Sequence, residues 1–180
     1  LPSEAAMIGQ YLDGGGKGML LLDADTDPQL DDVLKKWNIE LGKDIVLDFS
    51  AMGQMVGGGP VTPLVMNYGS HPITSSFNRT MTIFPQARSV KVLPNSNTGV
   101  TSTTLLTTSE NSWGETELKA GVEPTLDAGK DNKGPLALGV AASKSLGENK
   151  EAPGYMAVAK EIANGAIDEV VQQRVAVPIP

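Results

Sequence analysis

The sequence predicts an α/β domain in which a mainly parallel sheet is sandwiched by helices. A helical pattern over residues 3–13 leads into an apolar run between Lys17 and Asp23, and a second helical pattern follows over residues 28–38. A strand that is apolar at successive positions is typical of a sheet covered on both faces. We therefore expect residues 19–22 to form a central strand, with both helices packed on the sheet.

The first helix is indicated by apolar residues at helical spacing, among them Ala6, Met7 and Tyr11. Three successive glycines that begin at Gly14 end the pattern. In the strand that follows, a central position would place Leu21 in the core. Leu21→Ala is then expected to lower the free energy of unfolding by about 2–5 kcal/mol.

The second helix is predicted to begin at the dipeptide Asp27-Pro28, with Asp27 as its N-cap and the proline in its first turn. Its apolar side chains share one face, which is the face expected to pack on the sheet. These residues are Leu30, Val33, Leu34 and Trp37. A short β-prone run over residues 44–49 follows the second helix.

The middle of the chain predicts loops and short strands. Residues 50–63 are rich in Met, Gln and Gly, with three adjacent glycines followed by Pro60, which predicts a surface loop without regular structure. Residues 111–135 combine charges and glycines without a hydrophobic period, so we interpret them as a mobile loop or excursion. Further short strands are expected at residues 80–85, 89–93, 101–108 and 136–143.

The C-terminal part of the chain predicts one more helix and one more strand. Residues 155–171 are rich in alanine, with apolar side chains three and four residues apart, which favours a helix. Residues 174–177 are typical of a short strand that ends at Pro178. The length of 180 residues is that of about one domain, so residues 1–180 are expected to form a single domain.

Composition excludes several classes of function. The chain has 180 residues, of which 21 are acidic and 14 basic, and its net charge is −7. No run of lysines or arginines can follow a phosphate backbone, so we expect no nucleic-acid partner. The chain contains no cysteine, which excludes disulfides, zinc-thiolate sites and a cysteine nucleophile. His71 is its one histidine, which excludes a metal site of two or more histidines.

The sequence also predicts a soluble piece. Hydrophobic residues make up 40% of the chain and charged residues 19%, which is enough to bury a core. The longest apolar run, residues 136–142, is far shorter than the roughly 20 residues that cross a bilayer. No basic segment followed by an apolar one opens the chain as a leader would.

The most suggestive local feature is an acidic turn formed by Asp23, Asp25 and Asp27 directly after the apolar run. Ligands of open α/β sheets gather at the carboxyl ends of strands, and clustered carboxylates there suit a divalent cation. An EF-hand loop is excluded, because its glycine and glutamate positions hold Pro28 and Leu34.

Two enzyme patterns pass close to the acidic turn. A haloacid-dehalogenase-type phosphatase has threonine where Asp27 stands, and a nucleotide-sugar glycosyltransferase needs a further catalytic carboxylate and a segment like Gln-x-x-Arg-Trp. The simpler interpretation is structural: Asp27 caps the helix, and Asp23 and Asp25 accept hydrogen bonds from backbone amides of the turn. We therefore expect no bound metal and no cofactor, and keep the three aspartates as candidate binding residues.

Ser70 and His71 are the other candidate binding residues. A serine nucleophile beside a histidine is conceivable, but adjacent residues rarely face each other productively and no Gly-x-Ser-x-Gly elbow is present. The alternative is a histidine that holds the turn before Pro72 through backbone hydrogen bonds. The glycine clusters at residues 14–18 and 57–59 do not fit a phosphate-binding loop, which favours turns there.

Several segments, taken in order, resemble the auxiliary component of ABC-type transport systems related to gliding-motility transporters. These segments are YLDGGGK at 11–17, DADTDP at 23–28, WNIELG at 37–42, GPVTP at 59–63, YGSHPIT at 68–74 and FPQARS at 84–89. The resemblance covers roughly residues 1–110. Beyond them it rests on order alone: a Thr/Ser-rich strand, the segment SWG at 112–114 and the apolar strand at 136–142.

The resemblance implies a flavodoxin-like or glutamine-amidotransferase-like α/β fold, of which this chain would be an excised fragment. It implies a location on the extracytoplasmic, periplasmic side of the cell membrane, with anchoring only through segments absent from this chain. Permease and ATPase subunits of the transporter would be the partners, together with a possible small ligand. Amidotransferase activity is excluded on chemistry, because that reaction uses a cysteine.

Two hypotheses about function follow. The first is a non-enzymatic extracytoplasmic binding or interaction domain of a bacterial ABC-type transport system. The alternative is a metal-dependent transferase or phosphatase that uses Asp23 and Asp25. The sequence shows no second group of catalytic residues beside these aspartates, which favours the interaction domain.

Overall fold

The computed structural model describes residues 2–55, 57–77, 79–94 and 97–145, and the backbone of residues 154–159. Short strands dominate these residues. In chain order the elements are α1 (Pro2–Asp13), β1 (Gly18–Leu20), α2 (Asp31–Lys36), β2 (Ile39–Leu41), β3 (Ile45–Asp48), α3 (Ala51–Met55), β4 (Leu64–Val65), β5 (Asn67–Tyr68), β6 (Thr82–Ile83), β7 (Val90–Val92), β8 (Val100–Thr107), β9 (Ser112–Glu115), β10 (Asn132–Lys133), β11 (Ala137–Lys144) and β12 (Gly154–Ala159).

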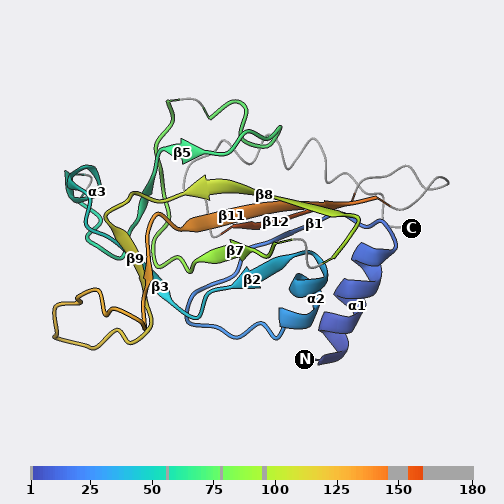
Figure 1. Ribbon diagram of the computed structural model, residues 1–180, viewed down its shortest axis with the longest axis horizontal. Coiled ribbons are helices and arrows are strands. Elements are labelled where there is room, and N and C mark those ends of the chain that lie inside the picture. Colours follow the sequence, from blue (N-terminus) through green and yellow to red (C-terminus); the bar gives the residue numbers. More distant parts are fainter. Residues whose placement is uncertain (1, 56, 78, 95–96, 146–153, 160–180) are drawn as a thin grey trace.

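The strands form small, largely antiparallel sheets (Figure 1). The largest sheet has five strands in the order β1-β12-β11-β8-β5, and a three-stranded sheet has the order β10-β9-β3. Two further pairs are β2 with β7 and β4 with β6. Among the described pairings, only that of β1 with β12 is parallel. The predicted mainly parallel sheet sandwiched by helices, and the flavodoxin-like or amidotransferase-like fold implied by the resemblance, are therefore wrong.

The predicted central position of residues 19–22 is also wrong, because β1 lies at an edge of the five-stranded sheet. Leu20 and Leu22 pack against a buried cluster, whereas Met19 and Leu21 on the other face are 40% and 53% exposed. The uninterrupted apolar run thus has one covered face and one exposed face. Burial alternates along the run, as in any strand with one face on the core and the other in solvent, although apolar and polar residues do not alternate in its sequence.

The position of Leu21 reverses the expectation for Leu21→Ala. More than half of this side chain is already in water, so the substitution removes little buried surface and leaves no enclosed cavity. We predict a loss of less than about 1 kcal/mol in the free energy of unfolding, measured in urea. A loss of 2 kcal/mol or more would show that the face of β1 that bears Leu21 is covered in solution.

Two buried clusters stabilise the fold, and β11 contributes to both. The first core contains Leu12, Leu30, Val33, Leu34, Trp37, Ile39, Leu41, Val90, Val140 and Ala142. The second core contains Val46, Val65, Phe84, Ala87, Leu105, Leu106, Leu136, Leu138 and Ala141. The register of β11 with β8 shifts around Gly139, and this irregularity places Leu138 in the same core as Ala141 rather than in that of Val140.

The two predicted N-terminal helices are present, with one difference in how the second begins. α1 ends directly before Gly14, as its glycines predict. α2 spans Asp31–Lys36 and buries the predicted apolar face, but it begins four residues after Asp27 and has no side-chain cap. Asp27 instead accepts the Gln29 N–H at 3.0 Å. The predicted helix cap is therefore wrong, because Asp27 closes a local turn before the helix.

Short strands lie within or overlap the predicted ranges 44–49, 80–85, 89–93, 101–108 and 136–143, as β3, β6, β7, β8 and β11. The segment predicted as an irregular loop contains the short helix α3, whose Gly53 N–H is accepted by Ser50 Oγ at 3.1 Å. The helix predicted over residues 155–171 is wrong at its start, because Gly154–Ala159 form β12 beside β1. Residues 160–171 and the strand predicted at 174–177 lie outside the described residues.

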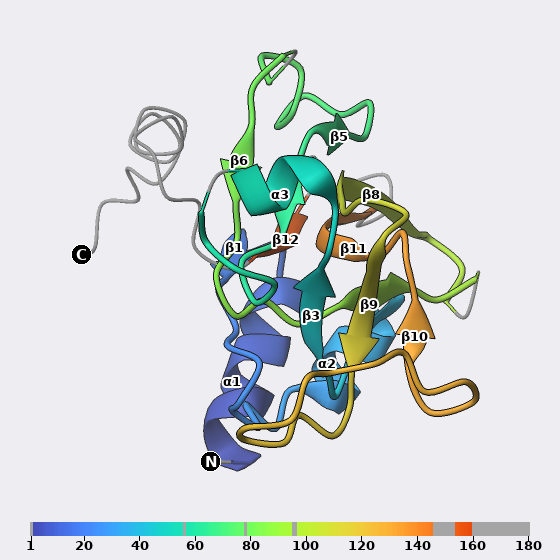
Figure 2. The ribbon, with the colours of Figure 1, turned by 90° about the vertical axis from the view of Figure 1, so that its left-hand side faces the viewer.

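The segment interpreted as a mobile loop is shorter than predicted. β9 and β10 occupy its two ends and pair with each other, which leaves a hairpin loop of residues 116–131 between them. This loop extends away from the sheets at the end of the molecule that holds β3 and β9 (Figures 1 and 2). Its mobility stays a prediction.

Candidate functional site

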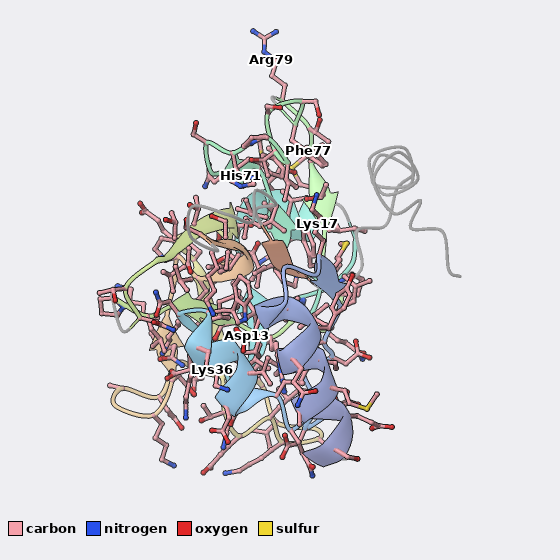
Figure 3. The ribbon with its side chains drawn as sticks, turned by 90° about the vertical axis from the view of Figure 1, so that its right-hand side faces the viewer. Asp13, Lys17, Lys36, His71, Phe77 and Arg79 are labelled. Carbon is pink, nitrogen blue, oxygen red and sulfur yellow. The ribbon has the colours of Figure 1, made fainter. Side chains whose placement is uncertain are left out.

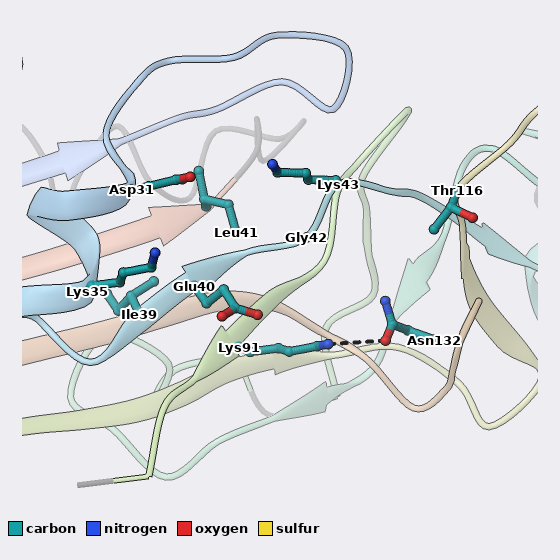
Figure 4. Close-up of a pocket in the computed structure, with 10 residues that line it drawn as sticks. All are labelled: Asp31, Lys35, Ile39, Glu40, Leu41, Gly42, Lys43, Lys91, Thr116 and Asn132. Atoms are coloured by element: carbon teal, nitrogen blue, oxygen red, sulfur yellow. Dashed lines mark hydrogen bonds between the residues drawn. The ribbon is translucent and has the colours of Figure 1, made fainter. Parts of the chain in front are cut away.

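A groove of about 330 Å³ lies between α2, the β2–β7 pair and the base of the hairpin loop (Figure 4). Its lining includes the buried Ile39 and Leu41 of β2 and, at its rim, charged side chains. The lining residues are Asp31, Lys35, Ile39, Glu40, Leu41, Gly42, Lys43, Lys91, Thr116 and Asn132. Lysine, carboxylate, amide and hydroxyl groups in this set offer polar contacts to a bound molecule.

The rim of the groove is more basic than the rest of the chain. It holds three lysines and two acids, whereas the whole chain carries a net charge of −7. Lys91 Nζ donates a hydrogen bond to Asn132 Oδ1 at 3.1 Å. Within the described part of the chain, the side-chain ammonium groups of Lys35 and Lys43 make neither a hydrogen bond nor an ion pair. Two ammonium groups at this rim are therefore available to a polar partner or a small ligand.

A buried carboxylate supports the groove from below. Asp44 Oδ1 accepts the Ser89 N–H at 2.8 Å, and Asp44 Oδ2 accepts hydrogen bonds from Ser89 Oγ at 2.7 Å and Asn132 Nδ2 at 3.2 Å. A Cβ at Gly42 or at Gly114 would collide with this cluster, so both positions require glycine. Asn132 thus connects the rim of the groove to the interior through fixed hydrogen bonds.

The acidic turn lies on the surface, apart from the groove lining. Asp23, Asp25 and Asp27 are all exposed. The turn is held from behind by Arg88, whose Nη2 donates to the carbonyl oxygens of Ala24 at 2.7 Å and Thr26 at 2.9 Å. Among the described residues, no group of three or more His, Cys, Asp or Glu side chains is placed to hold a metal ion.

We predict that magnesium, manganese and calcium each shift the melting temperature by less than about 2 °C. A divalent ion at about 100 times its dissociation constant would stabilise the fold by about 2.7 kcal/mol, which corresponds to a shift of roughly 5–11 °C for a domain of this size. Thermal unfolding with and without each ion measures the difference. A saturable manganese shift that disappears in Asp25→Ala would contradict this prediction.

Ser70 and His71 lie in the excursion between β5 and β6, whereas the acidic turn lies between β1 and α2. His71 Nδ1 accepts the Ile73 N–H at 3.2 Å, and its carbonyl oxygen accepts the Thr74 N–H at 3.0 Å. Ser70 is exposed. Figure 3 shows His71 well away from α1 and α2. The structure thus does not bring the two groups of predicted site residues together.

Partial burial lowers the pKa of His71, because desolvation disfavours the imidazolium form. The folded state then favours neutral His71 relative to the unfolded chain. Stability from this residue is present above its unfolded pKa of about 6.5 and is lost as the pH falls through the lower folded value.

We predict that an NMR titration of His71, the one histidine, has a lower midpoint in the folded chain than in the chain unfolded by urea. The lower midpoint follows from the cost of placing the imidazolium form in a partly buried site. A folded midpoint equal to or above the unfolded one would contradict the described burial of the ring.

Comparison with known proteins assigns the chain to a transport family. The family model of the ABC transporter auxiliary family, described as "ABC-type uncharacterized transport system", matches residues 2–169. The chain belongs to this family. No curated protein matches the chain. The resemblance noted in the sequence is thus confirmed at the level of an ABC-type auxiliary component.

The auxiliary-family chain has no helix, within its described residues, that is long and apolar enough to cross a membrane. Its longest described helix, α1, has 12 residues. The groove and the exposed apolar side chains of the hairpin loop are the features of this family member that sequence reasoning missed. The signal for these side chains is the set of apolar residues among the charges of the 111–135 segment.

Proposed function

We propose that this chain is a non-enzymatic extracytoplasmic interaction domain of a bacterial ABC-type transport system related to the gliding-motility transporters. The family match over residues 2–169 carries the proposal. In this role the domain binds the permease of the transporter, and through it associates with the ATPase subunit, or binds a small ligand in the lysine-rimmed groove. Segments outside the present chain supply the membrane anchor.

The hydrogen bonds that the buried carboxylates accept support a non-enzymatic role. Asp48 accepts hydrogen bonds from the backbone N–H groups of Ser50 and Leu64 at 2.9 and 3.2 Å. Glu115 accepts hydrogen bonds from Glu117 N–H at 3.1 Å and Trp113 Nε1 at 3.2 Å. A general acid or base needs a carboxyl group within reach of a substrate proton, whereas these carboxylates hold turns and strand ends together.

Chemical cross-linking in membranes tests the proposed partners. The full-length tagged protein is cross-linked in its own host, solubilised in mild detergent and purified through the tag. We expect the permease and ATPase subunits in the purified material, in amounts comparable with the tagged protein. Recovery of the intact tagged protein without either subunit would contradict the proposed role.

The absence of cysteine in this chain permits a direct test of its location. Gln10→Cys, on the exposed side of α1, introduces a single thiol into the domain. In intact cells, a membrane-impermeant maleimide should label this position if the domain is extracytoplasmic. Val46→Cys, in the second core, is the matched control that stays unlabelled while the domain is folded. Labelling of Gln10→Cys only after cell lysis would contradict the location.

A further inference from the structure

The hairpin loop of residues 116–131 exposes apolar side chains where a polar loop is expected. Leu118, Val122 and Leu126 are 48%, 60% and 42% exposed, and they lie within nine residues of one another. A single exposed leucine is ordinary on a protein surface, but several in one projecting loop suggest a contact surface. Figure 1 shows the loop extending away from the sheets, so its residues are accessible to another protein.

The base of this loop is held in place. Asp131 Oδ1 accepts hydrogen bonds from both the N–H and the Oγ of Thr116, each at 3.1 Å, and Asp131 Oδ2 accepts the Asp127 N–H at 2.8 Å. Lys130 and Glu117 add an ion pair of 3.6 Å across the base. The tip, residues 118–126, is therefore connected to a base that is fixed by hydrogen bonds and an ion pair. This restraint reduces the conformational entropy that the loop loses on binding.

The charges on the loop indicate the chemistry of the partner. Lys119 and Lys130 both pair with Glu117, at 4.0 and 3.6 Å. Glu123, between two of the exposed apolar residues, makes no hydrogen bond or ion pair with the described residues. Residues 116–131 contain four acids and two lysines, a balance that is unfavourable for binding to an anionic membrane surface.

We propose that the loop tip, residues 118–126, is a docking element that inserts Leu118, Val122 and Leu126 into an apolar groove on a protein subunit of the transport system. Glu123 meets a basic residue at the edge of that groove, which sets the orientation of the complex. Thr116 and Asn132 flank the loop and also line the lysine-rimmed groove, so the loop leaves the domain beside this groove. This docking role rests on the proposed function.

The test compares binding of the purified chain and its variants to the detergent-solubilised permease–ATPase complex. The loop variant carries Leu118→Ser, Val122→Ser and Leu126→Ser. The matched control carries Met7→Ser, Met55→Ser and Met81→Ser, three exposed apolar side chains outside the loop. We expect at least tenfold weaker binding for the loop variant and less than a twofold change for the control. A single Glu123→Lys substitution is expected to weaken binding and to reverse the dependence of the dissociation constant on salt concentration.

The outcomes separate this docking role from the proposed function. Wild-type binding that the loop variant retains in full overturns the docking role alone. Absence of wild-type binding overturns the proposed function and the docking role together. Loop-dependent flotation of the chain with vesicles of phosphatidylcholine and phosphatidylglycerol would assign the tip to a membrane and also overturn the docking role. Thermal unfolding of each variant checks that the fold is intact, which we expect because all seven substituted side chains are exposed.

Discussion

Leu34→Ala is expected to lower the free energy of unfolding by about 2–5 kcal/mol. Leu34 is fully buried in α2, within the first core. Truncation to alanine removes buried apolar surface and leaves a cavity that the surrounding helices and strands fill only in part. Urea unfolding followed by tryptophan fluorescence measures the loss, since Trp37 lies in the same core.

Leu21→Ala is the matched control for this substitution. Both replace leucine by alanine, but Leu21 is on the exposed face of β1, so the two free-energy losses should differ by more than about 1 kcal/mol. A loss below 1 kcal/mol for Leu34→Ala would show that α2 does not pack on the first core as described. Equal losses for the two variants would contradict the exposure of Leu21.

Asp44→Ala should cost about 2–4 kcal/mol in the free energy of unfolding. The substitution removes the acceptor of three hydrogen bonds and leaves the buried Ser89 N–H without a partner. It also frees Asn132, which connects β10 to this cluster, so the rim of the lysine-rimmed groove should lose its fixed geometry.

The control for Asp44→Ala is Asp31→Ala, which removes an exposed carboxylate at the same groove. Surface substitutions of this kind change stability by within about 0.5 kcal/mol. Denaturant unfolding of both variants, with the folded spectra compared by NMR, measures the contrast. A similar, small effect of both substitutions would mean that the Asp44 cluster does not support the fold.

Individual elements of this fold such as α1 and α2 are predictable from the sequence. Which strands pair with each other in a sheet is not. The apolar face of α2 and the glycine stop after α1 act within a few residues, so periodicity and capping rules detect them. Strand pairing depends on contacts between distant segments. The apolar runs of β1 and β11 look alike in sequence, yet β11 is central and β1 is at an edge.

The difference between these two runs has a physical basis. β11 has eight residues and contains Gly139, Ala141 and Ala142, whose small size allows two cores to approach it from opposite faces. β1 has three residues, and Met19 on its outer face is left exposed. Length and side-chain size, rather than unbroken hydrophobicity, were the better signal for the central strand.

The candidate site was harder to predict because no local motif encodes it. The lysine-rimmed groove combines residues from α2, β2, β7 and β10, which lie up to about a hundred positions apart in the sequence. The acidic turn is a candidate site in the sequence because three aspartates alternate over five residues. In the structure, hydrogen bonds from Arg88, which lies far along the chain, hold the backbone of that turn. A short acidic motif is a weak indicator of a binding site when the sequence does not show which distant residues hold it in place.

The dissociation constant between the purified chain and the detergent-solubilised permease–ATPase complex tests the central claim most directly. An interaction domain predicts saturable binding in the micromolar range or tighter. It also predicts no manganese-dependent hydrolysis of phosphate esters by the chain alone. Absence of saturable binding, together with manganese-dependent hydrolysis that disappears in Asp25→Ala, would contradict the claim and establish an enzyme instead.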